Sequence, residues 1–158
     1  GVMLGPASAD SQDELSQYIV GSGLQPQLVV INAKDNPIHK IEPVLSRSDV
    51  FIPISDSRLI NIATAKWILL LSYRHKVPVI AFSKSYLKAG ALAAIYSSPA
   101  DVAQDAAEWL IKAKGKTVGD LYKPAHYSIN FNKSVAGNLK IKLEAEQLYR
   151  DQFNREMN

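Results

Sequence analysis

The chain has 158 residues, of which 47% are hydrophobic and 21% charged, and it contains no cysteine. These values are typical of one globular domain, and they exclude disorder, collagen and coiled coil as descriptions of the whole chain. Disulfides, thiolate zinc sites and cysteine nucleophiles are excluded as well. The net charge of +3 arises from 18 basic residues scattered among 15 acidic ones. Without a basic run, we expect no nucleic-acid partner.

No targeting segment is evident in the sequence. The longest apolar runs, such as residues 67–71, are far shorter than the roughly 20 residues that span a bilayer. The chain opens with Gly1-Val2-Met3 and no charged region, unlike a signal peptide. Because these residues already have the pattern of a strand, we expect an excised or processed chain.

The first half of the chain alternates short apolar strands with helices. Residues 2–4 and 28–31 are apolar runs of strand length. Residues 11–21 have the capping pattern and apolar spacing of a helix. A second helix begins at Asn36-Pro37, and Pro43 should kink or shorten it.

The second half continues the alternation. Strands are predicted over residues 50–54, 77–82 and 92–96, and helices from about 58 to 75 and over 99–114. Farther on, residues 127–131 alternate like a strand, and 144–158 form a polar tail that we expect to be helical.

Five apolar strands that alternate with helices predict an α/β fold. A parallel sheet buried on both faces needs continuous apolar strands, as seen here. We therefore predict a doubly wound parallel five-stranded sheet of flavodoxin-like order. Residues 1–115 form the α/β lobe with its fifth strand and following helix. Residues 116–158 form a C-terminal connection, a strand and the polar helical tail, and 115–123 is the one linker-like stretch.

In such a sheet, we expect the ligand-binding site to lie beyond the carboxyl ends of the strands. The loops that follow the first four strands, residues 5–10, 32–36, 55–57 and 83–86, hold hydroxyls, carboxylates and amides. Hydroxyls and helix N-terminal amides suit a small anion. The same residues are common helix caps, so both interpretations stay open.

Catalytic and metal-binding patterns are missing from the sequence. The three histidines, His39, His75 and His126, lie far apart and form no metal-ligand spacing. There is no G-x-S-x-G elbow, and Gly5-Pro6-Ala7-Ser8 is neither a dinucleotide fingerprint nor a P-loop. We therefore expect a protein that is not an enzyme and has no metal or cofactor.

Three stretches of the sequence, taken together, are more informative about the protein family than the rest of the chain. They are Asp49-Val-Phe-Ile-Pro-Ile-Ser-Asp56-Ser-Arg-Leu-Ile-Asn61, Tyr73-Arg-His-Lys-Val-Pro-Val-Ile-Ala-Phe-Ser83 and Lys88-Ala-Gly-Ala-Leu-Ala-Ala-Ile-Tyr-Ser97. In this order they resemble the ABC-transporter substrate-binding proteins of the type I periplasmic-binding superfamily. The likeness extends over almost the whole chain, but only to the second lobe and C-terminal segments of such proteins. The first lobe is absent, which points to a fragment or a reduced homologue.

The resemblance implies a solute-binding module of an ABC importer. It also implies that the protein works in the periplasm, or is otherwise extracytoplasmic and associated with a lipid or membrane. Its ligand would be small and polar or amino-acid-like, as in relatives linked to tryptophan, and its partners the transporter membrane subunits. By resemblance, Tyr86 offers an aromatic wall to the ligand. The full set of ligand-facing positions that the resemblance implies is Ser8, Ser55, Asp56, Asn61, Ser83 and Tyr86.

Two alternatives from other classes remain. A flavodoxin-like enzyme or flavin carrier would need a phosphate cradle at residues 8–11. The effector lobe of a transcription regulator shares the superfamily fold, although no helix-turn-helix segment is visible.

The helix over 99–114 carries an apolar stripe, which comprises Val102, Ala106, Trp109, Leu110 and Ala113. In two-lobed binding proteins this helix packs on the first lobe. Without that lobe, the helix either folds back onto its own sheet or covers its stripe with a second copy. We expect self-association through the 99–114 helix.

Overall fold

The computed structural model describes residues 1–113 and 124–157. Its strands form two groups, ordered β2-β1-β3 and β4-β5-β6. A parallel bridge between Phe51 and Val79 joins the groups. There the Phe51 N–H donates to Pro78 O at 2.9 Å, and the Ile80 N–H donates to Phe51 O at 3.0 Å. The strands are β1 (Val2–Leu4), β2 (Leu28–Val30), β3 (Ile52–Pro53), β4 (Ile80–Ala81), β5 (Ala93–Tyr96) and β6 (Ser128–Phe131).

The pairing confirms the predicted flavodoxin-like order. β1 runs parallel to β2 and β3, and β4 runs parallel to β5. The sixth strand, β6, pairs antiparallel with β5, in a register that sets Ile95 opposite Ile129. This strand corresponds to the alternating stretch predicted over residues 127–131, and it extends the five parallel strands at one edge.

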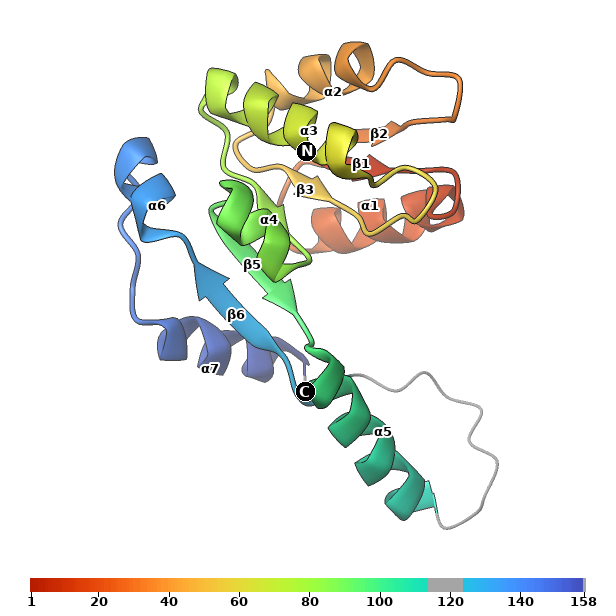
Figure 1. Ribbon diagram of the computed structural model, residues 1–158, viewed down its shortest axis with the longest axis vertical. Helices are drawn as coiled ribbons and strands as arrows, with labels where there is room; N and C mark the ends of the chain where they lie inside the picture. The colour runs from red at the N-terminus through yellow and green to blue at the C-terminus, as the bar shows by residue number, and fades with distance from the viewer. Residues whose placement is uncertain (114–123, 158) are drawn as a thin grey trace.

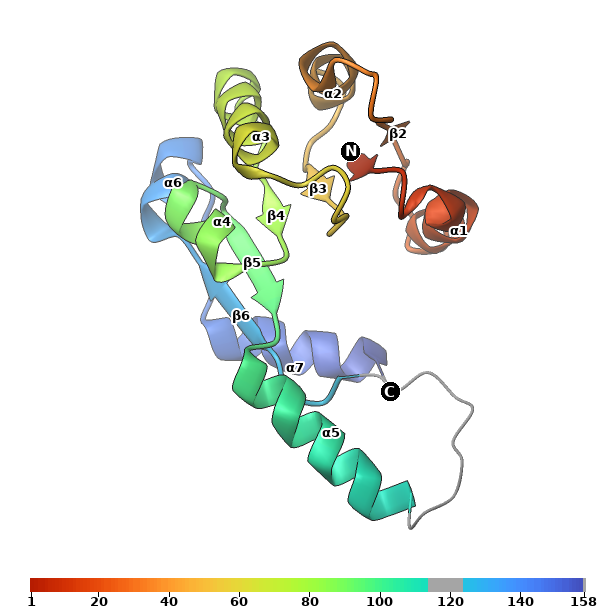
Figure 2. The same cartoon turned by 45° about the vertical axis from the view of Figure 1, so that its right-hand side comes forward.

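Helices lie on both faces of the sheet. In Figure 2, α2 (Pro37–Leu45), α3 (Ile62–His75) and α4 (Lys84–Ala89) lie on one side of the strands, and α1 (Gln12–Gly21) lies on the other. Beyond β6, α6 (Lys133–Leu139) joins the first side and α7 (Glu146–Met157) the second. A short 3-10 turn, η1 (Ala9–Ser11), precedes α1.

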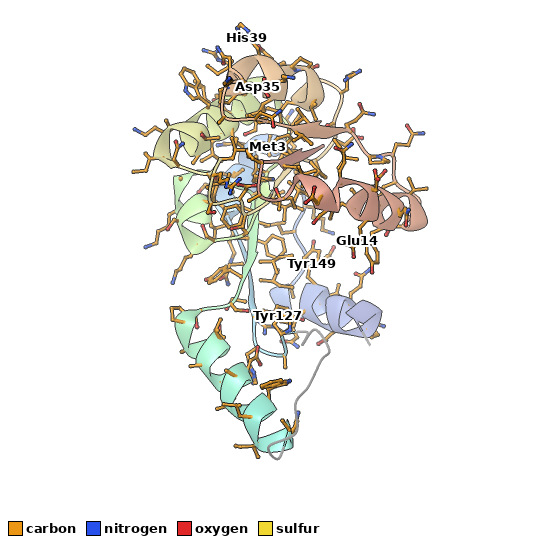
Figure 3. All side chains as sticks on the ribbon, turned by 90° about the vertical axis from the view of Figure 1, so that its right-hand side faces the viewer. Met3, Glu14, Asp35, His39, Tyr127 and Tyr149 are labelled. Carbon is orange, nitrogen blue, oxygen red and sulfur yellow. The ribbon has the colours of Figure 1, made fainter. Side chains whose placement is uncertain are left out.

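The core lies between the sheet and the α2–α3 layer. Met3, at the centre of the lobe in Figure 3, is fully buried. It belongs to one apolar cluster that also includes Ile41, Leu45, Phe51, Ile68, Leu71 and Val79. This packing fixes the strands whose carboxyl ends carry the predicted site.

Three helices differ from the sequence-based expectation. α3 begins at Ile62 rather than Arg58, because the Asn61 side chain accepts the Thr64 N–H at 3.0 Å and thereby caps the helix there. Two short helices, α4 and α6, were not predicted. Ser83 and Asn132 cap them, and six or seven residues are too few to show helical periodicity.

The helix α5 (Pro99–Ala113) extends away from the sheet, as Figure 1 shows. Its one buried residue is Asp105, whereas Val102 and Leu110 are 56% and 63% exposed. The apolar stripe that we predicted is therefore not folded back onto its own sheet within the described residues. The linker-like stretch 115–123 lies outside the described residues.

Candidate functional site

The loops after β1 and β3 are joined through the carboxylate of Asp56. Its Oδ2 accepts the backbone N–H groups of Ala7 and Ser8, each at 2.9 Å, and the Ser8 hydroxyl at 2.8 Å. Its Oδ1 accepts the Arg58 N–H at 2.9 Å. Asp56 is only 2% exposed. Two loops about fifty positions apart in the sequence are thus fixed to one buried carboxylate.

The close approach of these loops depends on a glycine. A Cβ atom at Gly5 would lie 2.5 Å from Cγ of Asp56 and 2.8 Å from Cβ of Leu59. No side chain fits at that distance without moving the loops apart. Only glycine, which has no Cβ atom, allows Asp56 and Leu59 to approach the backbone this closely.

Hydrogen bonding keeps Asp56 ionised. Burial alone would raise the pKa of its carboxyl, but the hydrogen bonds from the Ser8 hydroxyl and from the Arg58, Ala7 and Ser8 amides outweigh burial and hold the pKa below its usual value. The site consequently holds a negative charge that is already fully hydrogen-bonded.

Two predicted serines lie at the same edge of the sheet. Ser55 is exposed next to Asp56, and Ser83 follows β4, the parallel neighbour of β3. The Ser83 hydroxyl accepts the Tyr86 N–H at 3.4 Å and caps α4. The fold therefore brings Ser8, Ser55, Asp56 and Ser83 to one rim, which we call the ligand rim. Their contact with a ligand stays a prediction.

Tyr86 lies in the core, with its side chain 6% exposed, and does not form an exposed wall of the rim. Its ring packs against Phe82, with centroids 5.2 Å apart. Its hydroxyl is buried without a hydrogen-bond partner among the described residues, and burial raises its pKa to about 12. A buried hydroxyl without a hydrogen-bond partner lowers the stability of the folded protein, and this one can still form a hydrogen bond with water or a ligand.

Asn61 lies in a different setting from the rim serines. It caps α3 and lines a pocket of about 470 Å³ between the N-termini of α2 and α3, together with Lys34, Thr64 and Trp67. Lys34 belongs to the loop over residues 32–36, where a site was predicted, whereas Thr64 and Trp67 were not predicted as site residues. A larger cavity, of about 730 Å³, lies at the opposite edge of the sheet, where Val77 and Pro78 precede β4, and is remote from the ligand rim.

A second polar cluster, which was not predicted, joins the middle of α5 to the segment before β6. His126 Nδ1 lies 2.6 Å from Oδ1 of Asp105, and His126 Nε2 lies 3.8 Å from Glu108. The hydrogen bond to Asp105 raises the pKa of His126, and the nearby Glu108 adds to this effect. Because the partners are 21 residues apart, no short motif reveals them. Within the described residues, no group of His, Asp and Glu side chains is arranged to hold a metal ion.

The fold has close counterparts among solved structures. A conserved domain protein from Vibrio cholerae aligns with a TM-score of 0.66 and 24% identity, over 95% of this chain and 52% of that one. A Streptococcus pneumonia ABC domain, solved in complex with L-Trp, aligns with a TM-score of 0.64 and 16% identity, over 91% and 51% of the two chains.

A third structure shares the same fold. A ligand-free, open substrate-binding protein with adhesive properties from Clostridium difficile aligns with a TM-score of 0.62 and 19% identity, over 92% of this chain and 50% of that one. This chain therefore spans about half the length of the structures it matches. No protein-family model and no curated protein matches the sequence. The chain therefore shares its fold with these structures, one of which is a substrate-binding protein and another an ABC domain in complex with L-Trp.

Proposed function

We propose that this chain is a solute-binding module that holds a small polar or amino-acid-like ligand at the ligand rim. The observation that carries the proposal is the construction of the rim itself. Asp56 fixes two loops by four hydrogen bonds, and the neighbouring hydroxyls of Ser55 and Ser83 lie at the same edge. Pre-ordered polar groups at the carboxyl ends of parallel strands suit reversible ligand binding.

The arrangement favours binding over catalysis. The Ser8 hydroxyl donates to Asp56, and no histidine stands beside it to act as a base. His75 is 3.4 Å from Glu42 and His126 pairs with Asp105, while His39 is exposed on the outer side of α2 (Figure 3). We therefore propose that the chain is not an enzyme.

The same loop argues against a bound flavin phosphate. A phosphate cradle at residues 8–11 would need free amides, but the Ser8 N–H already donates to Asp56 and the Ser11 N–H donates to Ser8 O. The adjacent carboxylate would also repel a phosphate. The binding module is thus better supported than the flavin carrier.

The partners that we propose follow from the shared fold. They are the membrane subunits of an ABC importer, with the module working outside the cytoplasm. L-Trp, present in one matching structure, suggests an aromatic amino acid as the first ligand to test. None of the helices described here has the length and apolar character needed to cross a bilayer.

Mapping of backbone amide shifts tests the proposal. With L-tryptophan and a panel of other L-amino acids, we expect weak, saturable shifts at residues 5–8, 55–57 and 83–86. Ser83→Ala should weaken binding about fivefold, the value of one hydrogen bond, whereas Ser85→Ala, an exposed neighbour on α4, should not. If the whole panel leaves the rim amides unshifted, the proposed function is wrong.

A further inference from the structure

The cavity of about 730 Å³ lies at the amino ends of β4 and β5, away from the ligand rim. Val77 and Pro78 in its lining precede β4, and Gly90 precedes β5, whereas the rim lies at the carboxyl ends of the strands. Its walls come from α3, α4 and α6, which lie on the same side of the sheet (Figure 2). Its volume is within the range of small-molecule sites.

The lining of this cavity is mostly aliphatic. It includes Leu70, Val77, Pro78, Val79, Val135 and Leu139. The two valines before β4 are buried, so they form the inner part of the lining. Transfer of apolar ligand surface from water to such a lining is favourable. The cavity therefore suits a ligand with an aliphatic body.

Exposed side chains of α3 extend the apolar lining to the surface. Leu70 and Tyr73 both line the cavity and are 39% and 74% exposed. They are three residues apart on the helix, so they lie on the same face. A ligand in the cavity would cover apolar surface that is now in contact with water.

The charges in the lining have one sign. Arg74 lies in the last turn of α3 and Lys76 caps that helix, whereas no carboxylate lines the cavity among the described residues. Among the side chains that the structure describes, neither cation has an ion-pair partner. Glu42, on α2, lies 3.4 Å from His75 and is not part of the lining.

Helix C-termini at the cavity do not cancel these two charges. α3, α4 and α6 all end there, and each C-terminus carries a partial negative charge of at most about half a unit. Two full positive charges exceed the sum of three such partial charges. The Asn138 side chain, on α6, adds an amide that can donate a hydrogen bond. The polar groups of the cavity therefore suit an anion.

We propose that this cavity is a second binding site and that it takes a small aliphatic carboxylate. The aliphatic chain covers the apolar lining, and the carboxylate lies next to Arg74 and Lys76. An amino acid would bring an ammonium group close to the same two cations, which disfavours it here. The site thus differs from the ligand rim in the class of its ligand as well as in its place.

Amide shift mapping with sodium octanoate tests this site directly. We expect saturable shifts at the amides of residues 72–77, 90 and 138–139. 1-Octanol lacks the charge and acetate lacks the chain, so both should bind more weakly than octanoate. Octylamine, which has the same chain and the opposite charge, should bind most weakly of the four.

Substitution of the two cations tests the role of charge. Arg74→Gln and Lys76→Gln should each weaken octanoate binding about threefold, as expected for one exposed charge pair, and should reduce its sensitivity to salt. Lys140→Gln is the matched control. Lys140 also caps a helix in the left-handed conformation, with φ of 58° against 56° for Lys76, but it is not part of the lining. Its replacement should change the affinity by a smaller factor.

Three results would overturn the proposal. They are the absence of saturable octanoate shifts at the cavity, an affinity that is unchanged in both Arg74→Gln and Lys76→Gln, and equal binding of octanoate and octylamine. Because the amides of the ligand rim are different ones, any of these results leaves the solute-binding proposal to its own test.

Discussion

Asp56 has a structural role that its sequence context does not reveal. The resemblance to substrate-binding proteins implies that it faces a ligand. The structure shows it buried, with all its hydrogen bonds directed to Ser8, Ala7 and Arg58. Such a role depends on which loop packs against which, and local sequence holds no information on that. The edge of the sheet was predictable from strand order, but the partners of each side chain were not.

Replacing Asp56 should destabilise the protein in a pH-dependent way. Asp56→Asn presents an amide to the Ala7 and Ser8 N–H groups, and we expect a loss of at least about 2 kcal/mol at neutral pH. The folded pKa lies below the unfolded value, so this stability is present above pH 3.8 and is lost as the pH falls through the folded pKa. Urea unfolding at several pH values should show the two proteins converging in acid.

The exposed Asp13 provides the control for that experiment. Asp13→Asn, at the start of α1, should change stability by a few tenths of a kcal/mol at most. If Asp56→Asn and Asp13→Asn lowered the free energy of unfolding equally, Asp56 would not be the residue that holds the loops after β1 and β3 together.

Gly5 tests the spacing of the same loops. Gly5→Ala should destabilise the protein by about 1–3 kcal/mol, because the new methyl group meets Asp56 and Leu59. Gly21→Ala is the matched control, since nothing lies within 4 Å of its added Cβ. At the end of α1 it should be neutral or slightly stabilising. Thermal unfolding compares the two variants. Equal unfolding midpoints would show that the loops accommodate a methyl group at position 5 without loss of stability, which would contradict this prediction.

Among the elements, the strands and long helices were the most predictable. Apolar runs placed the parallel strands, and caps and helical spacing placed α1, α2, α3 and α5. The polar tail that contains α7 was also expected to be helical. The observed β3 and β4 are shorter than the predicted strands, because the two meet through a single bridge at Phe51 and Val79. The short helices α4 and α6 escaped prediction because only their caps mark them.

The pairing of His126 with Asp105 should hold the middle of α5 against the segment before β6. Since the Asp105 hydrogen bond is the main cause of the raised pKa of His126, Asp105→Asn should bring that pKa back toward 6.5. A raised folded pKa means that the stability from this pair is complete below pH 6.5 and is lost as the pH rises through the folded pKa. Proton NMR titration of the His126 ring measures the shift.

The His126 titration has a clear opposite outcome. An unchanged pKa in Asp105→Asn would mean that other groups set the charge of His126. Hydrogen exchange provides a second measurement, since amides in α5 should exchange faster in His126→Gln than in the parent protein.

At the scale of the molecule, the apolar stripe on α5 predicts self-association. Val102 and Leu110 of this stripe are 56% and 63% exposed, and the neighbouring Ile111 is 75% exposed. Apolar surface of this kind is costly to leave in water. Light scattering should show a mass that rises with concentration. Leu110→Glu should shift the equilibrium toward the monomer, whereas Lys112→Gln, on the same helix, should not. A strict monomer at high concentration would refute the prediction.

This chain spans about half the length of the structures it matches, and we expect it to bind its ligand weakly. A binding cleft formed by two lobes buries most of a ligand, and one lobe supplies about half of those contacts. We therefore expect dissociation constants no tighter than millimolar, or about 4 kcal/mol of binding free energy. Calorimetry that finds micromolar binding of an amino acid to this chain would contradict that expectation.

The central claim, a solute site at the ligand rim, is tested most directly by a crystal structure of the chain grown with saturating L-tryptophan. We expect electron density for the amino acid at the carboxyl ends of β1, β3 and β4, in contact with Ser55 or Ser83 and with Asp56 still bonded to Ser8. Density confined to another surface, or an empty rim at saturating ligand, would contradict it.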